Sequence, residues 1–274
     1  MAAERGASHP SVKELRRLVA KRRERRDSGR CVLEGPDLVE AALDAGVQME
    51  TLFVDAEKQE EVLVAALMAR ASRAGVDVVT LGRRVFESVA ESATPQSVLA
   101  TVTWSPASLV NLPEGGCIVV LHEIRDPGNA GTIIRSAEAS GASAVIFTGD
   151  SVDPTNPKTL RATAGAIFAI PVVVADRDET FERFRSRNVP VLAALAHGGA
   201  DPLDSGLAGD VCVVFGNESS GLDADTVARC DGSLTIVTPG RSESLSVAAA
   251  ATVIVFEALR QRRATETAAK PSSL

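Results

Sequence analysis

Residues 235–259, TIVTPGRSESLSVAAAATVIVFEAL, contain a strand signal, a polar loop and a helix signal in immediate succession. Residues 235–238 are all β-branched, which predicts a buried strand. Pro239 and Gly240 then turn the chain, and Ser246 is suited to cap an alanine-rich helix that extends to about Arg260. This order gathers backbone N–H groups and hydroxyls around a small space, which suits a polar ligand at a sheet edge. An ordinary strand-to-helix connection would show the same pattern.

The length and composition indicate a globular protein with one large domain or two of ordinary size. The chain has 274 residues, of which 45% are hydrophobic, enough to form buried cores. No apolar run approaches the roughly 20 residues that cross a bilayer. The N-terminus, MAAERGASHP, lacks the apolar centre of a secretory signal. We therefore expect a cytoplasmic protein with no membrane partner.

The use of cysteine and histidine argues against a metal site. The four cysteines are scattered without a C-x-x-C pair, and three of them lie in or beside apolar runs, where cysteine acts as a small hydrophobe. The three histidines, His9, His122 and His197, are too dispersed for a convincing set of metal ligands. No metal cofactor is predicted.

One basic segment contrasts with the acidic balance of the whole chain. The formal net charge is −7, yet residues 13–30 contain nine basic residues and only three acidic ones, Glu14, Glu24 and Asp27. A basic block on an acidic protein is a candidate phosphate-binding surface, and a solvated helix face is the alternative. The nine residues are Lys13, Arg16, Arg17, Lys21, Arg22, Arg23, Arg25, Arg26 and Arg30.

The first half of the chain alternates helix and strand signals, which predicts a small α/β domain over residues 11–104. Residues 1–10 are expected to be disordered. The predicted helices cover residues 11–26, 37–45, 57–74 and 84–92, and the predicted strands cover residues 31–33, 49–54, 76–81 and 97–102. Residues 105–116, rich in Ser, Pro, Asn and Gly, are interpreted as a linker.

The second half repeats the pattern with more strongly apolar strands and predicts a larger domain over residues 117–263. Short apolar runs without alternation are typical of strands buried on both faces, hence of a mostly parallel sheet. The predicted strands are residues 117–121, 144–147, 170–175, 190–195, 211–215 and 234–237. The predicted helices are residues 129–140, 157–168, 179–186, 223–229 and 246–260. The small, polar residues 264–274 are expected to be a disordered tail.

Residues 122–142, HEIRDPGNAGTIIRSAEASGA, form the first motif that carries chemistry. They follow a predicted buried strand and open a helix, which Asn129 can cap. Gly131 permits close approach to the backbone, and Arg135 lies on the same helical face at i+4. An arginine at this place in an α/β sheet is well placed to bind phosphate.

Residues 213–222, VVFGNESSGL, form the second motif. Gly216 and Gly221 allow backbone N–H groups to face a ligand, and Glu218 places a carboxylate at the strand end. Neither motif is a G-x-G-x-x-G fingerprint, and the acidic residue that should follow such a fingerprint is absent. A nucleotide-binding enzyme of dehydrogenase type is therefore a weak alternative.

Together with the opening stretch, these motifs resemble, in order and spacing, the three signature motifs of the SpoU/TrmH family of RNA ribose 2′-O-methyltransferases in the SPOUT superfamily. The likeness covers nearly the whole chain. Residues 153–173, with Lys158, Arg161 and Gly165, also look like that family. The basic helix, LEGPDLVEAAL and ATPQSVLA (residues 93–100) are similar to its ribosomal-protein-like RNA-binding domain.

The resemblance implies a parallel sheet whose C-terminal part is tied in a trefoil knot, a homodimer, and S-adenosylmethionine as the cofactor. Knots are rare exceptions among chain connections and do not follow from hydrophobic periodicity. The cofactor-binding residues that the resemblance implies are Leu195, Ala196, His197, Gly198, Phe215, Gly216, Asn217, Glu218, Gly221, Ile236, Val237, Pro239, Ser244 and Leu245.

Position by position, the resemblance assigns catalytic-site roles to Asn129, Arg135, Glu218 and Ser244. Asn129 and Glu218 would support the site, Arg135 would engage the target nucleotide, and Ser244 would contribute to the substrate pocket. Accounts of the family make this arginine a general base, yet a guanidinium is a poor base near neutral pH. Orientation of a phosphate and stabilisation of charge on the ribose oxygen are chemically simpler roles.

The chain departs from the family at Ser246, where the third motif usually ends in asparagine. A serine hydroxyl also donates and accepts hydrogen bonds but is shorter than an amide side chain. We therefore include Ser246 among the candidate catalytic residues. The alternative function that it motivates is an RNA-binding or ribosome-assembly protein that keeps the fold but has weak or no catalysis.

The expected partner is structured RNA. The resemblance favours ribosomal RNA over transfer RNA, and the nucleotide is not determined. The residues expected to contact RNA are Lys13, Arg16, Arg17, Lys21, Arg22, Arg23, Arg25, Arg26, Lys158 and Arg161. Because the chain has no tyrosine and one tryptophan, Trp104, recognition by base stacking is not indicated. Recognition by shape and backbone contacts is expected instead.

Overall fold

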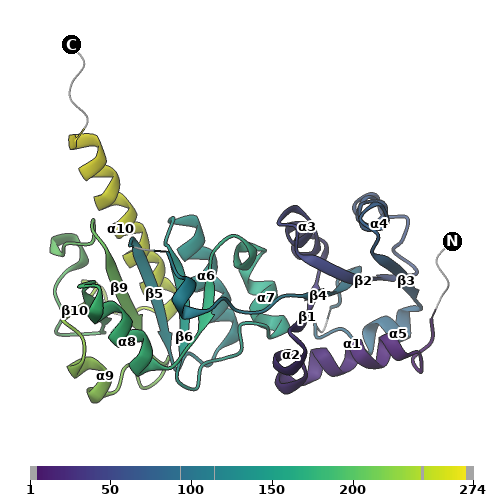
Figure 1. Cartoon of the computed structure of the whole chain (residues 1–274), viewed down its shortest axis with the longest axis horizontal. Coiled ribbons are helices and arrows are strands. Elements are labelled where there is room, and N and C mark those ends of the chain that lie inside the picture. The colour runs from purple at the N-terminus through teal and green to yellow at the C-terminus, as the bar shows by residue number, and fades with distance from the viewer. Residues whose placement is uncertain (1–4, 93, 114, 242–243, 270–274) are drawn as a thin grey trace, which may run out of the picture. The chain divides into compact units, whose positions relative to one another are not determined.

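The computed structural model describes residues 5–92, 94–113, 115–241 and 244–269 (Figure 1). These residues form two compact units. The first unit contains the chain up to Ser105 together with Asp153–Ala169, and the second contains Pro106–Val152 and the chain from Ile170 onward. The segment Asp153–Ala169, which the sequence placed in the larger domain, thus has its contacts in the first unit.

The first unit is a four-stranded mixed sheet between two layers of helices. The strands, in the order β1 (Arg30–Glu34), β4 (Val98–Thr103), β2 (Gln48–Asp55) and β3 (Asp77–Leu81), are antiparallel except for the parallel pair β2–β3. Helices α1 (Pro10–Ala20) and α5 (Arg83–Glu87) lie on one face, and α3 (Pro36–Asp44) and α4 (Val62–Arg73) on the other (Figure 1). Leu15, Leu18, Phe53, Phe86 and Leu99 form part of its core.

The basic helix expected over residues 11–26 is two helices. Lys21 has an extended backbone (φ −123°, ψ 112°) and separates α1 from α2 (Arg22–Ser28). The break has a local cause, because the Arg25 side chain donates hydrogen bonds to the carbonyl oxygens of Leu18 (2.8 Å) and Val19 (3.2 Å). These carbonyls lie at the end of α1, where helix acceptors lack partners within the helix.

Other helices are also shorter than expected, including α5, which ends at Glu87 rather than at residue 92. α4 begins at Val62 rather than residue 57, since the preceding residues form turns after Asp55, whose carboxylate accepts the Glu57 N–H at 3.1 Å. The helix expected over residues 157–168 is α7 (Pro157–Thr163) followed by the 3₁₀ turn Ala166–Phe168. Gly165, with φ 92°, lies against Ala41, and a Cβ at Gly165 would come within 2.4 Å of the Ala41 Cβ.

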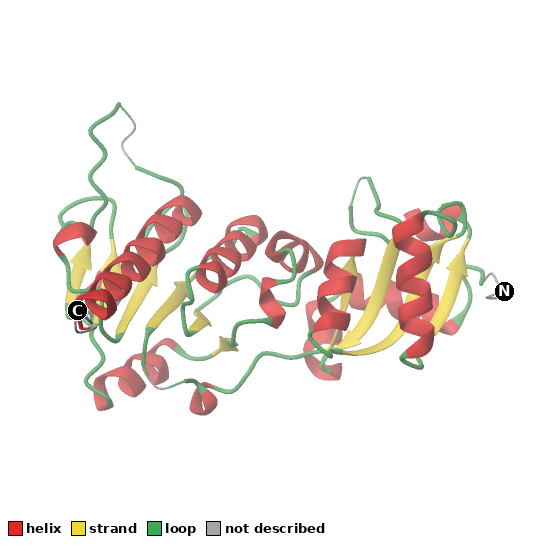
Figure 2. Ribbon diagram, turned by 90° about the horizontal axis from the view of Figure 1, so that it is seen from above, coloured by secondary structure: helices red, strands yellow, loops and turns green. Residues whose placement is uncertain are grey.

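The second unit is a six-stranded sheet in which every strand pair is parallel, as predicted (Figure 2). The strand order is β10 (Gly232–Leu234), β8 (Val191–Ala194), β9 (Val211–Phe215), β5 (Cys117–His122), β6 (Ala144–Thr148) and β7 (Val172–Val174). Helices cover both faces, with α6 (Pro127–Ala139) beside α10 (Val247–Ala269), and α8 (Arg177–Ser186) and α9 (Ala224–Ala228) opposite. The fold class is therefore α/β.

The prediction of a strand at residues 235–238 is wrong. The strand is Gly232–Leu234, and the following residues leave the sheet. Thr235 fixes this departure: its hydroxyl donates to the Leu195 carbonyl oxygen at 3.1 Å and accepts the Gly199 N–H at 2.8 Å. Thr235, one of the β-branched residues that suggested a strand, thus forms loop contacts instead.

The C-terminal segment also differs from the prediction of a disordered tail from residue 264, because α10 continues to Ala269. Alanine and glutamate favour helix there, and the hydroxyls of Thr265 and Thr267 bond to carbonyls four residues earlier. Residues 1–4 and 270–274, also expected to be disordered, lie outside the described residues. The predicted trefoil knot stays a prediction.

None of the described helices is long and apolar enough to cross a membrane. Within the described part of the chain, no group of three or more His, Cys, Asp or Glu side chains is placed to hold a metal ion.

Candidate active site

A pocket of about 310 Å³ opens at the carboxyl ends of β8, β9 and β10, beside α10. Ligand sites in parallel α/β sheets are expected at this edge. Ten of the predicted cofactor-binding residues line it: Leu195, Ala196, Phe215, Gly216, Asn217, Glu218, Gly221, Ile236, Ser244 and Leu245. Its walls combine apolar side chains with main-chain polar groups and one carboxylate.

The remaining predicted cofactor-binding residues do not line this pocket. They are His197, Gly198, Val237 and Pro239. Val237 is 66% exposed and lines a separate apolar groove. The sequence also missed residues on α10, namely Val247, Ala250 and Ile254, which close the pocket. Their spacing of three and four residues places them on one helical face, and this spacing could have identified them from the sequence.

Glycine is required where the pocket loop folds on itself. A Cβ at Gly216 would come within 2.4 Å of the Gly221 backbone, and Gly216 is buried. Asn217 and Gly221 exchange backbone hydrogen bonds of 3.1 and 2.9 Å. The Asn217 side chain also accepts the N–H groups of Ser219 and Ser220. The loop therefore holds one tight shape that a side chain at Gly216 would disrupt.

Glu218 joins the first and second motifs. Its carboxylate accepts the backbone N–H groups of Arg125 (3.2 Å) and Asp126 (3.0 Å) and the side-chain N–H of Asn129 (3.2 Å). Partial burial raises the pKa of Glu218, but hydrogen bonds from its own N–H and from these donors outweigh burial and lower that pKa. The carboxylate is therefore ionised at neutral pH and organises the loop before α6.

The start of α6 corrects one expectation. Asp126, not Asn129, is the N-cap, and its carboxylate accepts the Asn129 N–H at 2.7 Å. Asn129 therefore lies in the first turn, with its side chain free to reach Glu218. Arg135 lies further along α6, exposed, with no hydrogen bond or ion pair to any residue that the structure describes. It is available to a ligand.

The third motif approaches the pocket through Ser244 and Leu245. Ser246 acts as predicted at the start of α10: its hydroxyl accepts the Ala249 N–H at 3.3 Å, and its carbonyl oxygen accepts the Ala250 N–H at 2.9 Å. The hydroxyl that replaces the family's asparagine amide is thus used by the helix.

The first unit carries a basic groove along α1. Lys13, Arg16, Arg17 and Lys21 line it together with Pro10 and Ala20. Their spacing places the four cations along one exposed face of the helix. Lys13, Arg17 and Lys21 have no ion pair with any acidic residue in the described part of the chain, and Arg16 donates to the Ser88 hydroxyl at 3.1 Å. The groove can meet an anion without breaking internal pairs.

The expectation that Arg25 contacts RNA is wrong, because its side chain is only 4% exposed. Besides capping α1, it donates to the Asp153 carboxylate at 2.7 and 3.1 Å and to the Thr155 hydroxyl at 3.3 Å. Its guanidinium is therefore satisfied within the first unit and holds the segment Asp153–Ala169 there. Sequence reasoning missed this because the partner lies 128 residues away.

The other predicted RNA contacts divide into paired and free cations. Lys158 forms an ion pair with Glu91 (3.1 Å), and Arg161 pairs with Glu91 (3.3 Å) and the buried Glu34 (3.5 Å). On α2, Arg23 and Arg26 both pair with Asp27. Arg22 is exposed and has no ion pair within the described residues.

A parallel α/β sheet with a pocket between the loops at its strand ends is typical of proteins that bind a small ligand at that edge. Comparison with known proteins identifies the class. The SpoU rRNA Methylase family matches residues 116–256, and the MRM3-like substrate binding domain matches residues 9–100. The chain belongs to the SpoU rRNA methylase family.

Relatives of known activity cover almost the whole chain. The 23S rRNA (guanosine(2553)-2′-O)-methyltransferase RlmP of Bacillus subtilis is 30% identical over 91% of this chain and 96% of its own length. The 23S rRNA (uridine(2479)-2′-O)-methyltransferase of Streptomyces viridochromogenes is 28% identical over 99% of this chain and 100% of its own length.

A solved structure, the AdoMet-bound rRNA methyltransferase from Sinorhizobium meliloti, has a TM-score of 0.81 and 31% identity. The match covers 95% of this chain and 97% of that chain. S-Adenosylmethionine is the cofactor, and the residues present fit it. The pocket lies at the lower end of the roughly 300–1,000 Å³ of small-molecule sites. Apolar side chains such as Leu195, Phe215 and Ile236 line it together with the polar loop from Gly216 to Gly221.

Proposed function

We propose that the protein methylates a ribose 2′-hydroxyl in structured ribosomal RNA, with the pocket of β8, β9 and β10 as the cofactor site and Arg135 as the residue that engages the target. The observation that carries this proposal is the junction at Glu218. There the pocket loop and the loop that starts α6 share the Glu218 carboxylate. This carboxylate links the pocket wall to the helix that carries Arg135, which has no partner among the residues described.

S-Adenosylmethionine supplies an electrophilic methyl carbon on a sulfonium centre. The chain's own residues then perform binding and orientation. Leu195, Phe215 and Ile236 provide apolar surface, and the loop from Gly216 to Gly221 provides main-chain donors and acceptors in a fixed shape. Orientation of two reactants can lower a barrier by several kcal/mol, roughly 7–11 in favourable cases.

Arg135 orients the target nucleotide and stabilises negative charge on the ribose oxygen. A guanidinium remains protonated in proteins and presents planar donors that match phosphate geometry. Because the described residues leave Arg135 without an internal partner, an RNA phosphate need not displace a carboxylate. Asn129 and Glu218 act as supports that fix the start of α6.

The first unit supplies RNA affinity through the groove along α1. Four cations on one helix face suit contacts with backbone phosphates, and the chain has no tyrosine for stacking on bases. Binding of this kind releases counterions and weakens as salt concentration rises.

We infer that the protein works as a homodimer. An exposed groove of about 390 Å³ contains the apolar residues Leu203, Val237, Val253 and Phe256, which are each between 43% and 66% exposed. The charged residues Asp201, Glu257 and Arg260 also line it. Exposed apolar patches of this kind mark interaction sites, and α10 contributes Val253 and Phe256 to it. A second copy of this chain would cover the patch.

The targets of the relatives support ribosomal RNA as the substrate and the cytoplasm as its location. One relative acts on a guanosine and the other on a uridine of 23S rRNA, so the shared fold does not determine the base. The substrate nucleotide therefore depends on contacts outside the motifs.

The test is transfer of labelled methyl from S-adenosylmethionine to separated ribosomal and transfer RNA. We expect label in 23S rRNA, recovered as alkali-resistant dinucleotides, which report ribose 2′-O-methylation. Label confined to transfer RNA would overturn the choice of substrate. Products that alkali cleaves, or products methylated on the nucleobase, would overturn the proposed ribose 2′-O-methylation.

A second function has one observation in its favour. Ser246 replaces the asparagine usual in the family, and its hydroxyl is engaged by α10. An RNA-binding protein without catalysis would bind S-adenosylmethionine and RNA but transfer no label. In that case Ser246→Asn is the decisive variant: asparagine caps helices as well as serine does, so stability should hold while transfer appears.

A further inference from the structure

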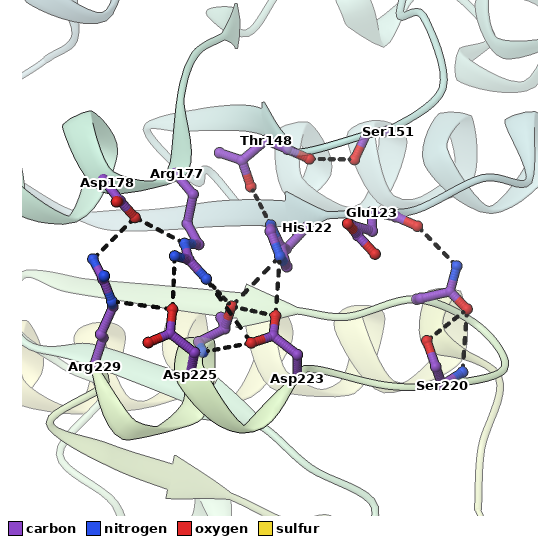
Figure 3. Close-up of polar contacts among 12 residues, drawn as sticks. His122, Glu123, Thr148, Ser151, Arg177, Asp178, Ser220, Asp223, Asp225 and Arg229 are labelled. Atoms are coloured by element: carbon purple, nitrogen blue, oxygen red, sulfur yellow. Dashed lines mark hydrogen bonds and ion pairs between the residues drawn. The ribbon is translucent and has the colours of Figure 1, made fainter.

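His122 ends β5 and lies at the centre of a buried polar network (Figure 3). Its Nδ1 lies 2.9 Å from the Thr148 hydroxyl on the neighbouring strand β6. Its Nε2 lies 3.5 Å from the Thr226 hydroxyl and 3.5 Å from the Asp223 carboxylate, between two oxygens rather than against one. His122, Thr148 and Thr226 are at most 6% exposed.

The hydrogen atoms on the Thr226 side are already assigned. The Thr226 hydroxyl donates to Asp223 Oδ2 at 2.6 Å and accepts a hydrogen bond from Arg177 Nη1 at 2.8 Å. Hydrogen bonds from the Thr226 hydroxyl and N–H, opposed by slight desolvation and aided by Arg177 and His122, lower the pKa of Asp223 to about 2. Asp223 is therefore an acceptor only, and Thr226 has no hydrogen left for the imidazole.

The ring must then supply the hydrogen on this side. Neutral imidazole has one donor and one acceptor nitrogen. With the hydrogen on Nε2, Nδ1 is an acceptor, and the Thr148 hydroxyl can donate to it. The opposite tautomer would set Nε2 against two oxygens without a hydrogen, and would leave the buried Thr148 hydroxyl without an acceptor among the described residues.

The network connects the two loops that meet at Glu218. On one side, His122 is followed directly by Glu123, whose carbonyl oxygen accepts a hydrogen bond from the Asn217 side chain at 2.9 Å. On the other side, Asp223 and Thr226 cap and begin α9, immediately after the pocket loop 216–222. The pocket loop is thus held at its start by Asn217 and Glu218, and at its end through Asp223 and His122.

We propose that His122 is a positioning residue for the cofactor pocket: with its hydrogen on Nε2, it fastens the end of loop 216–222 to the ends of β5 and β6. His122 itself does not line the pocket. Loss of this fastening lowers the fraction of molecules whose loop is ready to bind, which raises the apparent dissociation constant in proportion. The inference rests on the proposed function for its ligand. For its tautomer it rests on the hydrogen-bond geometry around the ring together with the ionised state of Asp223.

The tautomer is measured first, by long-range ¹H–¹⁵N correlation spectra of the full-length protein above pH 7. The chain has three histidines, so His122→Gln identifies the signals of His122 by their loss. We expect the pattern of an Nε2–H imidazole. An Nδ1–H pattern would overturn the proposed network, whatever the protein catalyses.

Binding is measured next, by calorimetric titration of S-adenosylmethionine into hydroxyl variants of Thr148. Thr148→Val removes the donor to Nδ1 and should weaken binding about tenfold, the effect of one buried hydrogen bond. Thr148→Ser keeps the hydroxyl and should bind within about twofold of the wild type. The matched control is Glu182→Gln, which removes an exposed ion pair with Arg185 that lies outside the His122 network.

The outcomes separate three cases. Equal cofactor affinity of the wild type and Thr148→Val refutes the positioning role, even if the melting temperature falls. Equal weakening by Thr148→Val and Thr148→Ser also refutes it, because rescue by the hydroxyl is required. No cofactor binding by a folded wild-type protein overturns the proposed function instead, while the spectrum of His122 still tests the network.

Discussion

Arg135 differs from the other charged residues of the site because it is exposed and has no polar partner among the residues that the structure describes. We expect Arg135→Ala to reduce methyl transfer at least about hundredfold, the loss typical of one charge-stabilising donor. The dissociation constant of S-adenosylmethionine should stay within twofold, since Arg135 does not line the pocket. The measurements are single-turnover transfer and calorimetry.

Arg185→Ala on α8 is the matched control, because Arg185 is exposed and pairs only with Glu182 within the described residues. Full activity of Arg135→Ala would refute its role in orientation as well as in charge stabilisation.

Glu218 acts through its charge as well as its position. Its lowered pKa means that the carboxylate stabilises the fold above the ordinary glutamate pKa of roughly 4.3, and that this contribution is lost as pH falls through the lowered value. We expect Glu218→Gln to reduce the free energy of unfolding at pH 7 by about 1 kcal/mol, a value limited by solvent screening. The difference from wild type should shrink below about pH 4.

Thermal melts of both proteins from pH 3 to 8 measure this dependence. Glu182→Gln on the exposed surface of α8 should melt like the wild type throughout. A constant difference between wild type and Glu218→Gln at every pH would show that charge has no part in the role of Glu218.

At the scale of elements, α1 and α2 differ in how their cations are paired: among the described residues Lys13, Arg17 and Lys21 of the α1 groove have no ion pair, whereas Arg23 and Arg26 of α2 pair with Asp27. We expect the triple variant Lys13→Ala, Arg17→Ala, Lys21→Ala to weaken RNA binding, and to reduce the slope of log affinity against log salt by about 2–3. The melting temperature should hardly change, because these side chains are exposed. Filter binding at salt concentrations from about 50 to about 300 mM measures this slope.

The matched control is the double variant Arg23→Ala, Arg26→Ala on α2, whose charges pair with Asp27. It should change the slope by less than the α1 variant. An equal loss from both variants would mean that net charge, rather than the groove, binds RNA.

The buried pair of Arg25 and Asp153 fastens α2 to the segment that contains α7. Loss of one partner leaves a buried charge uncompensated, which costs about 3–5 kcal/mol. We therefore expect Arg25→Met to destabilise the first unit by this amount, and the double variant with Asp153→Leu to recover much of it. The single tryptophan, Trp104, lies edge-on to Phe168 with ring centroids 6.3 Å apart, so its fluorescence reports on the same segment.

Urea unfolding followed by Trp104 fluorescence gives these free energies. If Arg25→Met unfolds like the wild type but binds RNA weakly, Arg25 is an RNA contact after all and its buried pair is dispensable.

At the scale of the whole molecule, the exposed apolar groove predicts self-association. We expect Phe256→Asp to convert a dimer to a monomer, because burial of a carboxylate in an apolar interface is strongly unfavourable. Size-exclusion chromatography with light scattering measures the mass. Val62→Asp, at an exposed apolar position of the first unit, is the control and should leave the dimer intact. A wild-type monomer at micromolar concentration would refute the homodimer.

The sequence by itself determined the features that depend on near neighbours along the chain. Short apolar runs such as residues 211–215 predicted the buried parallel strands, and Ser246 predicted the start of α10. The spacing of Asn129, Arg135, Glu218 and Ser244 carried the family resemblance, because motif chemistry requires those residue types at fixed offsets. These signals act over a few residues, so they can be read without the fold.

Tertiary structure alone decided which polar groups meet. It buried Arg25 against Asp153, moved residues 235–238 out of the sheet, and placed His122 between Thr148 and Asp223. In each case the deciding partner is distant in the chain, and a buried polar group must find a partner wherever the fold brings one. The free energy of such a pair depends on burial, which no local pattern of residues contains.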